Sequence, residues 1–408
     1  MTRESRDVLE YMSHVTIMRL HWFEGYKPFF FPLAWFLKQL CPSIPPQLVV
    51  KVSILLLDIV TAVIWYRIAR RISYFRLSKN NKGFAAKWVA RPTFLASIYL
   101  LNPFAIMYNE ACNSDGARYF WVTFAMYTAI KQYADYELNI LLYAVFQFAT
   151  IMMVQNATFK MIAVVLPLCY VVVFNRLRLT NNIAISMRQL GHILWYIIPH
   201  VVTTVSLFFA YNIATDVFSV YRTMEMDYAA RGKGIDYSLF WYLQRVLPDV
   251  FEVGNVFKSH AIIFLFPFPL MLVLRHRPLE YLFTMVNIAI IQQPGLTVLG
   301  VWYVICVLAI QYPLLDRTLG FTKLVIVMLM CEILTFFAYA AWAGFNIANP
   351  NFYFFPHLLI FFIMCIILED YSTITFVMAT REEIEERKMK LEMEERMKKQ
   401  KCCCHHGH

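Results

Sequence analysis

Residues 353–374, YFFPHLLIFFIMCIILEDYSTI, decide the fold class of this chain. Their first charged residue is Glu369. As a helix rising 1.5 Å per residue, the stretch spans about 33 Å, enough to cross the hydrocarbon core of a bilayer. The whole chain of 408 residues is 60% hydrophobic and only 16% charged, whereas soluble proteins are about 45–50% apolar and about 25% charged. The sequence therefore predicts an all-α integral membrane protein.

Apolar segments predict a polytopic helical bundle of about 11 spans. The expected spans are 48–66, 92–108, 117–133, 139–154, 158–174, 192–215, 253–274, 279–292, 296–314, 324–342 and 353–374. Short segments such as 279–292 also fit half-helices that line a cavity. Residues 27–40 contain two prolines and are too short to cross, so we expect them to lie in the interface or to re-enter.

The distribution of Lys and Arg predicts the orientation. The loop 67–91 holds eight basic residues and no acid, which places it in the cytosol. Alternation through the spans then puts fifteen basic loop residues on the cytosolic side and four on the other. The net charge of +10 is thus a sign of topology and not of nucleic-acid binding. We expect a lumenal or interfacial segment at 1–47, a transmembrane domain at 48–377 and a charged cytosolic tail at 378–408.

The tail alternates acidic and basic residues. Residues 381–401 hold eight Lys or Arg and seven Glu, with Glu placed before Lys or Arg in the order that favours i,i+4 pairs on a helix. This pattern predicts a solvated charged helix, or alternatively a helix that binds a partner. The Cys and His residues at 402–408 could bind a metal, carry palmitoyl groups or have no function.

Four ionisable residues fall inside apolar runs: Asp58, Lys160, Lys258 and Glu332. Charged groups at membrane depth are costly and usually face the bundle interior. The two lysines lie near helix ends, so we expect their amines to reach the interface. Asp58 and Glu332 lie deeper, where each would make either a buried hydrogen bond or a contact to a ligand.

The sequence contains no soluble catalytic motif of the GxSxG, HExxH, P-loop or GxGxxG type. The nine cysteines form no CxxC pair and no metal-ligand spacing, so, apart from the Cys and His residues at 402–408, we expect neither a metal site nor a cofactor. The informative polar clusters are of another kind. They are Asn102 and Pro103 in LLNPF, the aromatic group Phe240, Trp241 and Tyr242, the break at Gln292–Gly295, and GFNIANPNFY at 344–353. The amides of the last cluster could bind a polar headgroup, or they could cap the next helix.

These clusters, in this order, resemble the phosphatidylinositol glycan class U family of GPI transamidase subunits. The stretches that carry the resemblance are DIVTAVIWYRIA at 58–69, YLLNP at 99–103, LFWY at 239–242, and ANPNFY at 348–353 followed by Glu369, Asp370 and Tyr371. The resemblance implies a fold similar to the GT-C glycosyltransferases in the endoplasmic reticulum membrane, and a non-catalytic subunit that holds the GPI lipid. The catalytic Cys and His would belong to a caspase-like partner subunit.

The resemblance also implies site residues. Asn349, Asn351 and Phe352 match the family's AN-x-NF pattern and would contact the GPI headgroup. Phe240, Trp241 and Tyr242 would hold acyl chains, and Asp58 is a further candidate for contact with the lipid.

This sequence departs from the family pattern in three places. An N-terminal hydrophobic helix is missing, and restoring it would give about twelve spans. Val246 replaces a carboxylate, and Gln292-Gln293-Pro294 replaces a break that usually reads like KSYPT.

Two other functions are compatible with a polytopic helical bundle. One is a GT-C mannosyltransferase that uses dolichyl-phosphate mannose, which needs a carboxylate base in its first lumenal loop. The segment before residue 48 offers Glu4, Asp7, Glu10 and Glu24, with no acidic pair. The other is a secondary transporter, which predicts an internal repeat that the sequence lacks.

Overall fold

The computed structural model describes residues 39–40, 43, 45–78, 90–102, 115–134, 139–156, 159–174, 177, 187–214, 262–293, 296–312, 315–316, 320–341, 345, 347 and 350–404. Within these ranges the chain forms helices and no strand. The helices are α3 (Pro46–Ser78), α4 (Pro92–Leu100), α6 (Asp115–Ala134), α7 (Ile140–Asn156), η2 (Phe159–Met161), α8 (Ile162–Val173), α9 (Met187–Ala214), η4 (Ile262–Leu265), α13 (Pro267–Val273), α14 (Pro278–Ile291), α15 (Val298–Ala309), α17 (Phe321–Tyr339) and α18 (Pro350–Cys404). The all-α prediction is confirmed for this part of the chain.

Four of the described helices are long and apolar enough to cross a membrane: Lys51–Ser73, Leu190–Ala210, Phe321–Ala338 and Asn351–Val377. Other apolar helices are shorter, at 10–17 residues. The total of about 11 spans that the sequence predicts is not tested by the described residues and stays a prediction. One reason for the shorter helices is proline, since α13 and α14 each begin with a proline that fits the first helical position but not a helix interior.

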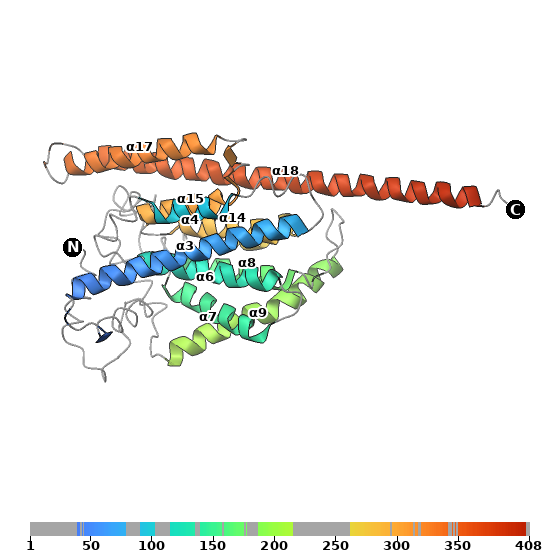
Figure 1. The fold of residues 1–408 in the computed structure, drawn as a ribbon, viewed down its shortest axis with the longest axis horizontal. Helices are drawn as coiled ribbons and strands as arrows, with labels where there is room; N and C mark the ends of the chain where they lie inside the picture. The colour runs from blue at the N-terminus through green and yellow to red at the C-terminus, as the bar shows by residue number, and fades with distance from the viewer. Residues whose placement is uncertain are drawn as a thin grey trace.

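The bundle is layered around α14 (Figure 1). α14 packs against α8, α13, α15 and α18, and nearly all of its residues are buried, including the polar Glu280, Thr284 and Asn287. α6 packs against α3, α7 and α8. The α17–α18 hairpin lies along one side of the bundle, and α7 with α9 lies on the other (Figure 1).

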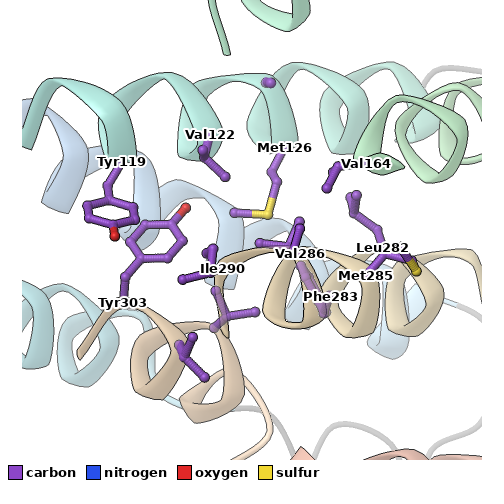
Figure 2. Packing of buried hydrophobic residues seen from close by; sticks show 14 of the residues in the cluster. Tyr119, Val122, Met126, Val164, Leu282, Phe283, Met285, Val286, Ile290 and Tyr303 are labelled. Atoms are coloured by element: carbon purple, nitrogen blue, oxygen red, sulfur yellow. The ribbon is translucent and has the colours of Figure 1, made fainter. Parts of the chain in front are cut away.

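The core between α6 and α14 is made of large apolar side chains. Figure 2 shows Val122 and Met126 of α6 facing Phe283, Val286 and Ile290 of α14. All five are at most 1% exposed. Large apolar side chains on the outer helices are instead open, as in Trp195 at 78% and Phe337 at 63%, which is the pattern expected where lipid covers the protein.

Hydroxyl groups inside the bundle are satisfied mainly by the helices that carry them. The hydroxyls of Ser53, Thr61, Thr123, Thr150 and Thr375 each donate to the carbonyl four residues earlier at 2.7–2.8 Å. This local bond removes the cost of placing a polar group in an apolar environment.

A polar network joins α9 to α7. The Tyr143 hydroxyl and His200 Nδ1 lie 2.6 Å apart, and the Gln147 amide donates to the same hydroxyl at 2.6 Å. Thr204 donates to Gln147 Oε1, also at 2.6 Å. Since α9 is otherwise largely open on its outer face, these bonds between helices help to hold it against the bundle.

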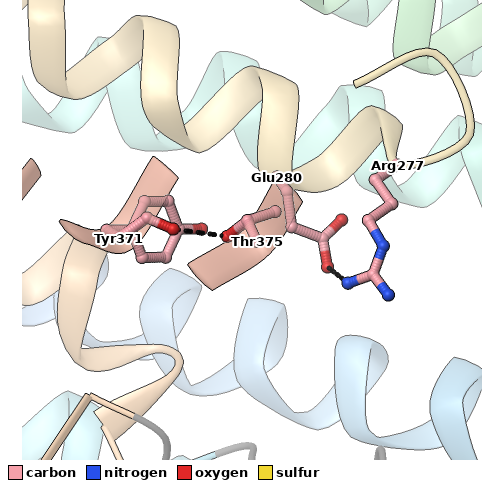
Figure 3. A network of polar contacts seen from close by, with 4 residues as sticks. All are labelled: Arg277, Glu280, Tyr371 and Thr375. Carbon is pink, nitrogen blue, oxygen red and sulfur yellow. Dashed lines mark hydrogen bonds and ion pairs between the residues drawn. The ribbon is translucent and has the colours of Figure 1, made fainter. Parts of the chain in front are cut away.

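α18 packs against α14 at a point where polar side chains of the two helices lie beside each other (Figure 3). Tyr371 and Thr375 of α18 lie beside Glu280 of α14, whose carboxylate is 3.8 Å from Arg277. Tyr371 and Thr375 are each 1% exposed and Glu280 is 8% exposed. This contact fixes one point along α18 against the bundle.

Candidate functional site

The turn between α17 and α18 presents an exposed surface that is both apolar and polar. The amide of Phe345 donates to the carbonyl of Ala340 at 3.0 Å, and that of Ile347 donates to Ala341 at 3.0 Å. These bonds close the C-terminal end of α17, whose last carbonyls would otherwise lack partners. The side chains of Phe345 and Ile347 are 72% and 79% exposed.

The first turn of α18 also carries exposed side chains. Pro350 opens the helix, as its fixed φ and missing amide proton allow. Asn351 is exposed, Phe352 is 69% exposed and Phe355 is 63% exposed. The amide of Asn351 can donate and accept hydrogen bonds, and the rings beside it can contact acyl chains. We call Phe345, Ile347, Asn351, Phe352 and Phe355 the turn surface.

Other predicted site residues lie outside the described part of the chain. These are Asn349, which directly precedes α18, and the aromatic group Phe240, Trp241 and Tyr242. Their roles stay predictions.

Asp58 lies in the bundle interior, beside Tyr99 and Gly116. It is 5% exposed, and its Oδ1 accepts a hydrogen bond of 3.1 Å from the Tyr99 hydroxyl of α4. A Cβ built on Gly116 of α6 would lie 3.1 Å from the same oxygen. Asp58 therefore joins α3 to α4 and α6, the buried hydrogen bond that the sequence offered as one of two possibilities.

Asp58 and the turn surface belong to different parts of the bundle. α3 packs against α4 and α6, whereas α17 packs against α18. A contact of Asp58 with the lipid stays a prediction.

Lys160 does not reach the interface as the sequence analysis expected. Its side chain is 2% exposed, and Nζ donates to the carbonyl of Gln292, which ends α14. A cation is favourable there because the last carbonyls of a helix carry partial negative charge. The lysine thus ties the η2 segment to the polar break at Gln292.

Arg118 of α6 was missed by the sequence analysis. Its side chain is 1% exposed, among the largest fully buried side chains of the described residues. The signal was available, because an Arg one residue inside the expected span 117–133 is a charged group at a membrane boundary. Glu332, which was singled out, is 7% exposed.

Comparison with known proteins identifies the family. The model for the GPI transamidase subunit PIG-U matches residues 22–389, which is nearly the whole chain. No curated protein matches the sequence. The matched region includes the helical bundle, the turn surface and every predicted site residue. The chain belongs to the PIG-U family of GPI transamidase subunits.

Proposed function

We propose that this chain is a non-catalytic subunit of the GPI transamidase in the endoplasmic reticulum membrane, where it binds the GPI lipid and presents it for attachment to proteins. The observation that carries the proposal is the turn surface, in which an exposed amide stands between exposed aromatic and aliphatic side chains. A GPI lipid has a matching division, with a polar glycan and phosphates on one side and acyl chains on the other.

In this proposal the chain contributes positioning and makes no bond itself. Asn349 and Asn351 orient the headgroup through hydrogen bonds, while Phe352 and the group Phe240, Trp241 and Tyr242 contact the acyl chains. The terminal amine of the lipid is then held where the acyl-enzyme of a caspase-like partner subunit can react with it. Holding two reactants in a productive arrangement removes much of the entropic cost of their encounter.

The first prediction concerns the two asparagines. In cells that lack the native subunit, we expect Asn349→Asp combined with Asn351→Asp to lower surface display of a GPI-anchored reporter, because two carboxylates repel headgroup phosphates and cannot donate hydrogen bonds. Flow cytometry of the reporter measures this. The matched control is Asn346→Asp, an asparagine of the same segment outside the AN-x-NF pattern.

Three measurements test the proposal. Unchanged reporter display in the double variant, at normal chain abundance, would show that the headgroup assignment is wrong. Lipid analysis of null cells separates the function classes, since accumulation of complete GPI fits a transamidase subunit and accumulation of an under-mannosylated precursor fits a mannosyltransferase. Mass spectrometry of the tagged chain purified in mild detergent tests for the partner subunits and the bound lipid.

A further inference from the structure

The central helix α14 carries a stripe of polar side chains along one side. Glu280, Thr284 and Asn287 are 8%, 1% and 0% exposed. They are four and three residues apart, so at about 100° per residue they lie within about 60° of one another around the helix axis. Glu280 lies beside Tyr371 and Thr375 of α18 (Figure 3). The stripe therefore begins on the side of α14 that meets α18.

The apolar side of α14 points elsewhere. Phe283, Val286 and Ile290 face α6 (Figure 2), and their mean direction is about a quarter turn away from that of the stripe. Thr284 and Asn287 are nevertheless as deeply buried as these apolar residues. Since almost none of their surface is exposed, neither a lipid nor a partner subunit can contact them directly. Any partner for their polar atoms has to lie inside the bundle.

The Thr284 hydroxyl does not follow the pattern of other buried threonines. Those of Thr61, Thr123 and Thr150 each donate to the carbonyl four residues earlier in the same helix. Thr284 makes no such bond to the carbonyl of Glu280, and within the described part of the chain its Oγ1 has no hydrogen-bond partner. The hydroxyl is thus free to bond to a group outside its own helix.

The side-chain amide of Asn287 is unpaired as well. Among the residues that the structure describes, neither its Nδ2 nor its Oδ1 has a hydrogen-bond partner. An amide has two donor hydrogens and two acceptor lone pairs, and burying them unpaired costs free energy. In native proteins such groups pair with the protein or with ordered water. A small polar molecule beside Asn287 would remove this cost.

The spacing of the two residues fits a single bridging molecule. Side chains three residues apart on a helix have Cβ atoms about 5–6 Å apart, a separation that one water spans with two hydrogen bonds of about 2.8 Å. A buried water makes about two to four hydrogen bonds, which the hydroxyl and the amide can supply. We propose that Thr284 and Asn287 bind an ordered water molecule on the side of α14 that meets α18. This site does not depend on the proposed function.

Apolar substitutions of similar shape in the full chain test the site. Thr284→Val and Asn287→Leu each remove one side of the bridge. With water bound, each should raise the unfolding equilibrium constant of the purified chain in mild detergent about fivefold, which corresponds to the loss of about one net hydrogen bond. The double substitution should raise it no further, because the same water is lost only once.

Two backgrounds provide the controls for this coupling. Thr284→Ser keeps the hydroxyl, so adding Asn287→Leu should again raise the unfolding constant about fivefold. Thr150→Val changes a buried threonine of α7 whose hydroxyl is paired within its own helix. Adding Asn287→Leu to that variant should also have its full effect, since the two sites share no partner.

Opposite results would overturn the inference. An unchanged or lower unfolding constant in either single variant would mean that an unpaired polar group had been replaced without loss, and losses that add in the double variant would mean that no molecule is shared. A density map of the native chain in its purified complex decides the matter if a variant does not fold. A peak about 2.7–3.2 Å from both Thr284 Oγ1 and an amide atom of Asn287 supports the site. Ordered side chains with no such peak, or with a larger molecule between them, contradict it.

Discussion

Gly300 of α15 lies closely against Tyr119 of α6. A Cβ built on it would be 2.5 Å from the hydroxyl oxygen of Tyr119 and 2.8 Å from Cδ1 of Leu296. Tyr119 is fully buried and stacks on Tyr303 with ring centroids 4.6 Å apart, so it has little room to retreat (Figure 2). Glycine is required here by the close approach of a ring and not by its backbone conformation.

We therefore expect Gly300→Ala to destabilise the protein. Overpacking a tight core costs about 1–3 kcal/mol, of which the better helix propensity of alanine returns up to about 1 kcal/mol. Thermal unfolding in detergent measures the difference. Gly116→Ala is the matched control with a smaller effect, because the closest atom to its Cβ would be the Asp58 carboxylate oxygen at 3.1 Å and the next, Cγ2 of Ile54, would be at an ordinary contact distance of 3.6 Å. Adding Tyr119→Phe, which removes the obstructing oxygen, should recover part of the loss, and no recovery would show that Tyr119 is not the obstacle.

At the scale of the element, the start of α17 is capped by a residue outside the helix. Oδ1 of Asp316 accepts hydrogen bonds from the hydroxyl of Thr322 at 2.5 Å and from its amide at 3.0 Å. The bond from the Thr322 side chain, followed by that from its amide, holds the pKa of Asp316 below its ordinary value. Gly320, with φ of 62°, makes the left-handed turn that brings the chain into the helix.

This cap predicts a pH dependence in the acid range. Because the pKa is lower in the folded than in the unfolded chain, the carboxylate stabilises the start of α17 above its unfolded pKa of about 3.9, and that contribution is lost as the pH falls through the folded pKa. Hydrogen exchange of the Thr322 amide should lose protection below about pH 4. Asp316→Asn should make this protection independent of pH over the same range. Protection in the native chain that does not change with acid would contradict the assignment.

The sequence predicted the existence of helices better than their ends. The expected spans 48–66 and 353–374 fall inside α3 and α18, but both helices continue well past them. A span predicted from hydropathy ends at the first charged residues. Arg, Lys and Glu are good helix formers, so the helix itself continues past that point. Asp58 and Glu332 were recognised because a charge in an apolar run is visible in the sequence. Tyr99, the hydrogen-bond partner of Asp58, lies on another helix at a position that packing decides, and no local pattern marks it.

At the scale of the whole molecule, α18 passes from the hairpin into an extension that projects beyond the bundle (Figure 1). The family match ends at residue 389, inside this extension. We expect a chain that stops after residue 389 to restore reporter display in null cells to the level of the full chain, because the turn surface and the α14 contact both lie before that point. A substantial loss at equal abundance would mean that residues 390–408 take part in GPI attachment. The full chain carrying Lys399→Gln is the control for altered charge alone.

The continuity of α18 has a mechanical consequence. At 1.5 Å per residue the helix is a rod of about 82 Å, seated on α14 near Tyr371. Measured from that seat, the arm toward Cys404 is about 50 Å and the arm toward Pro350 is about 32 Å. For a stiff rod that tilts about this fulcrum, a displacement of about 3 Å at the far end of the long arm moves Pro350 by about 2 Å in the opposite direction. In such a rod, a force applied at the C-terminal end of α18 is felt at its other end, beside the turn surface.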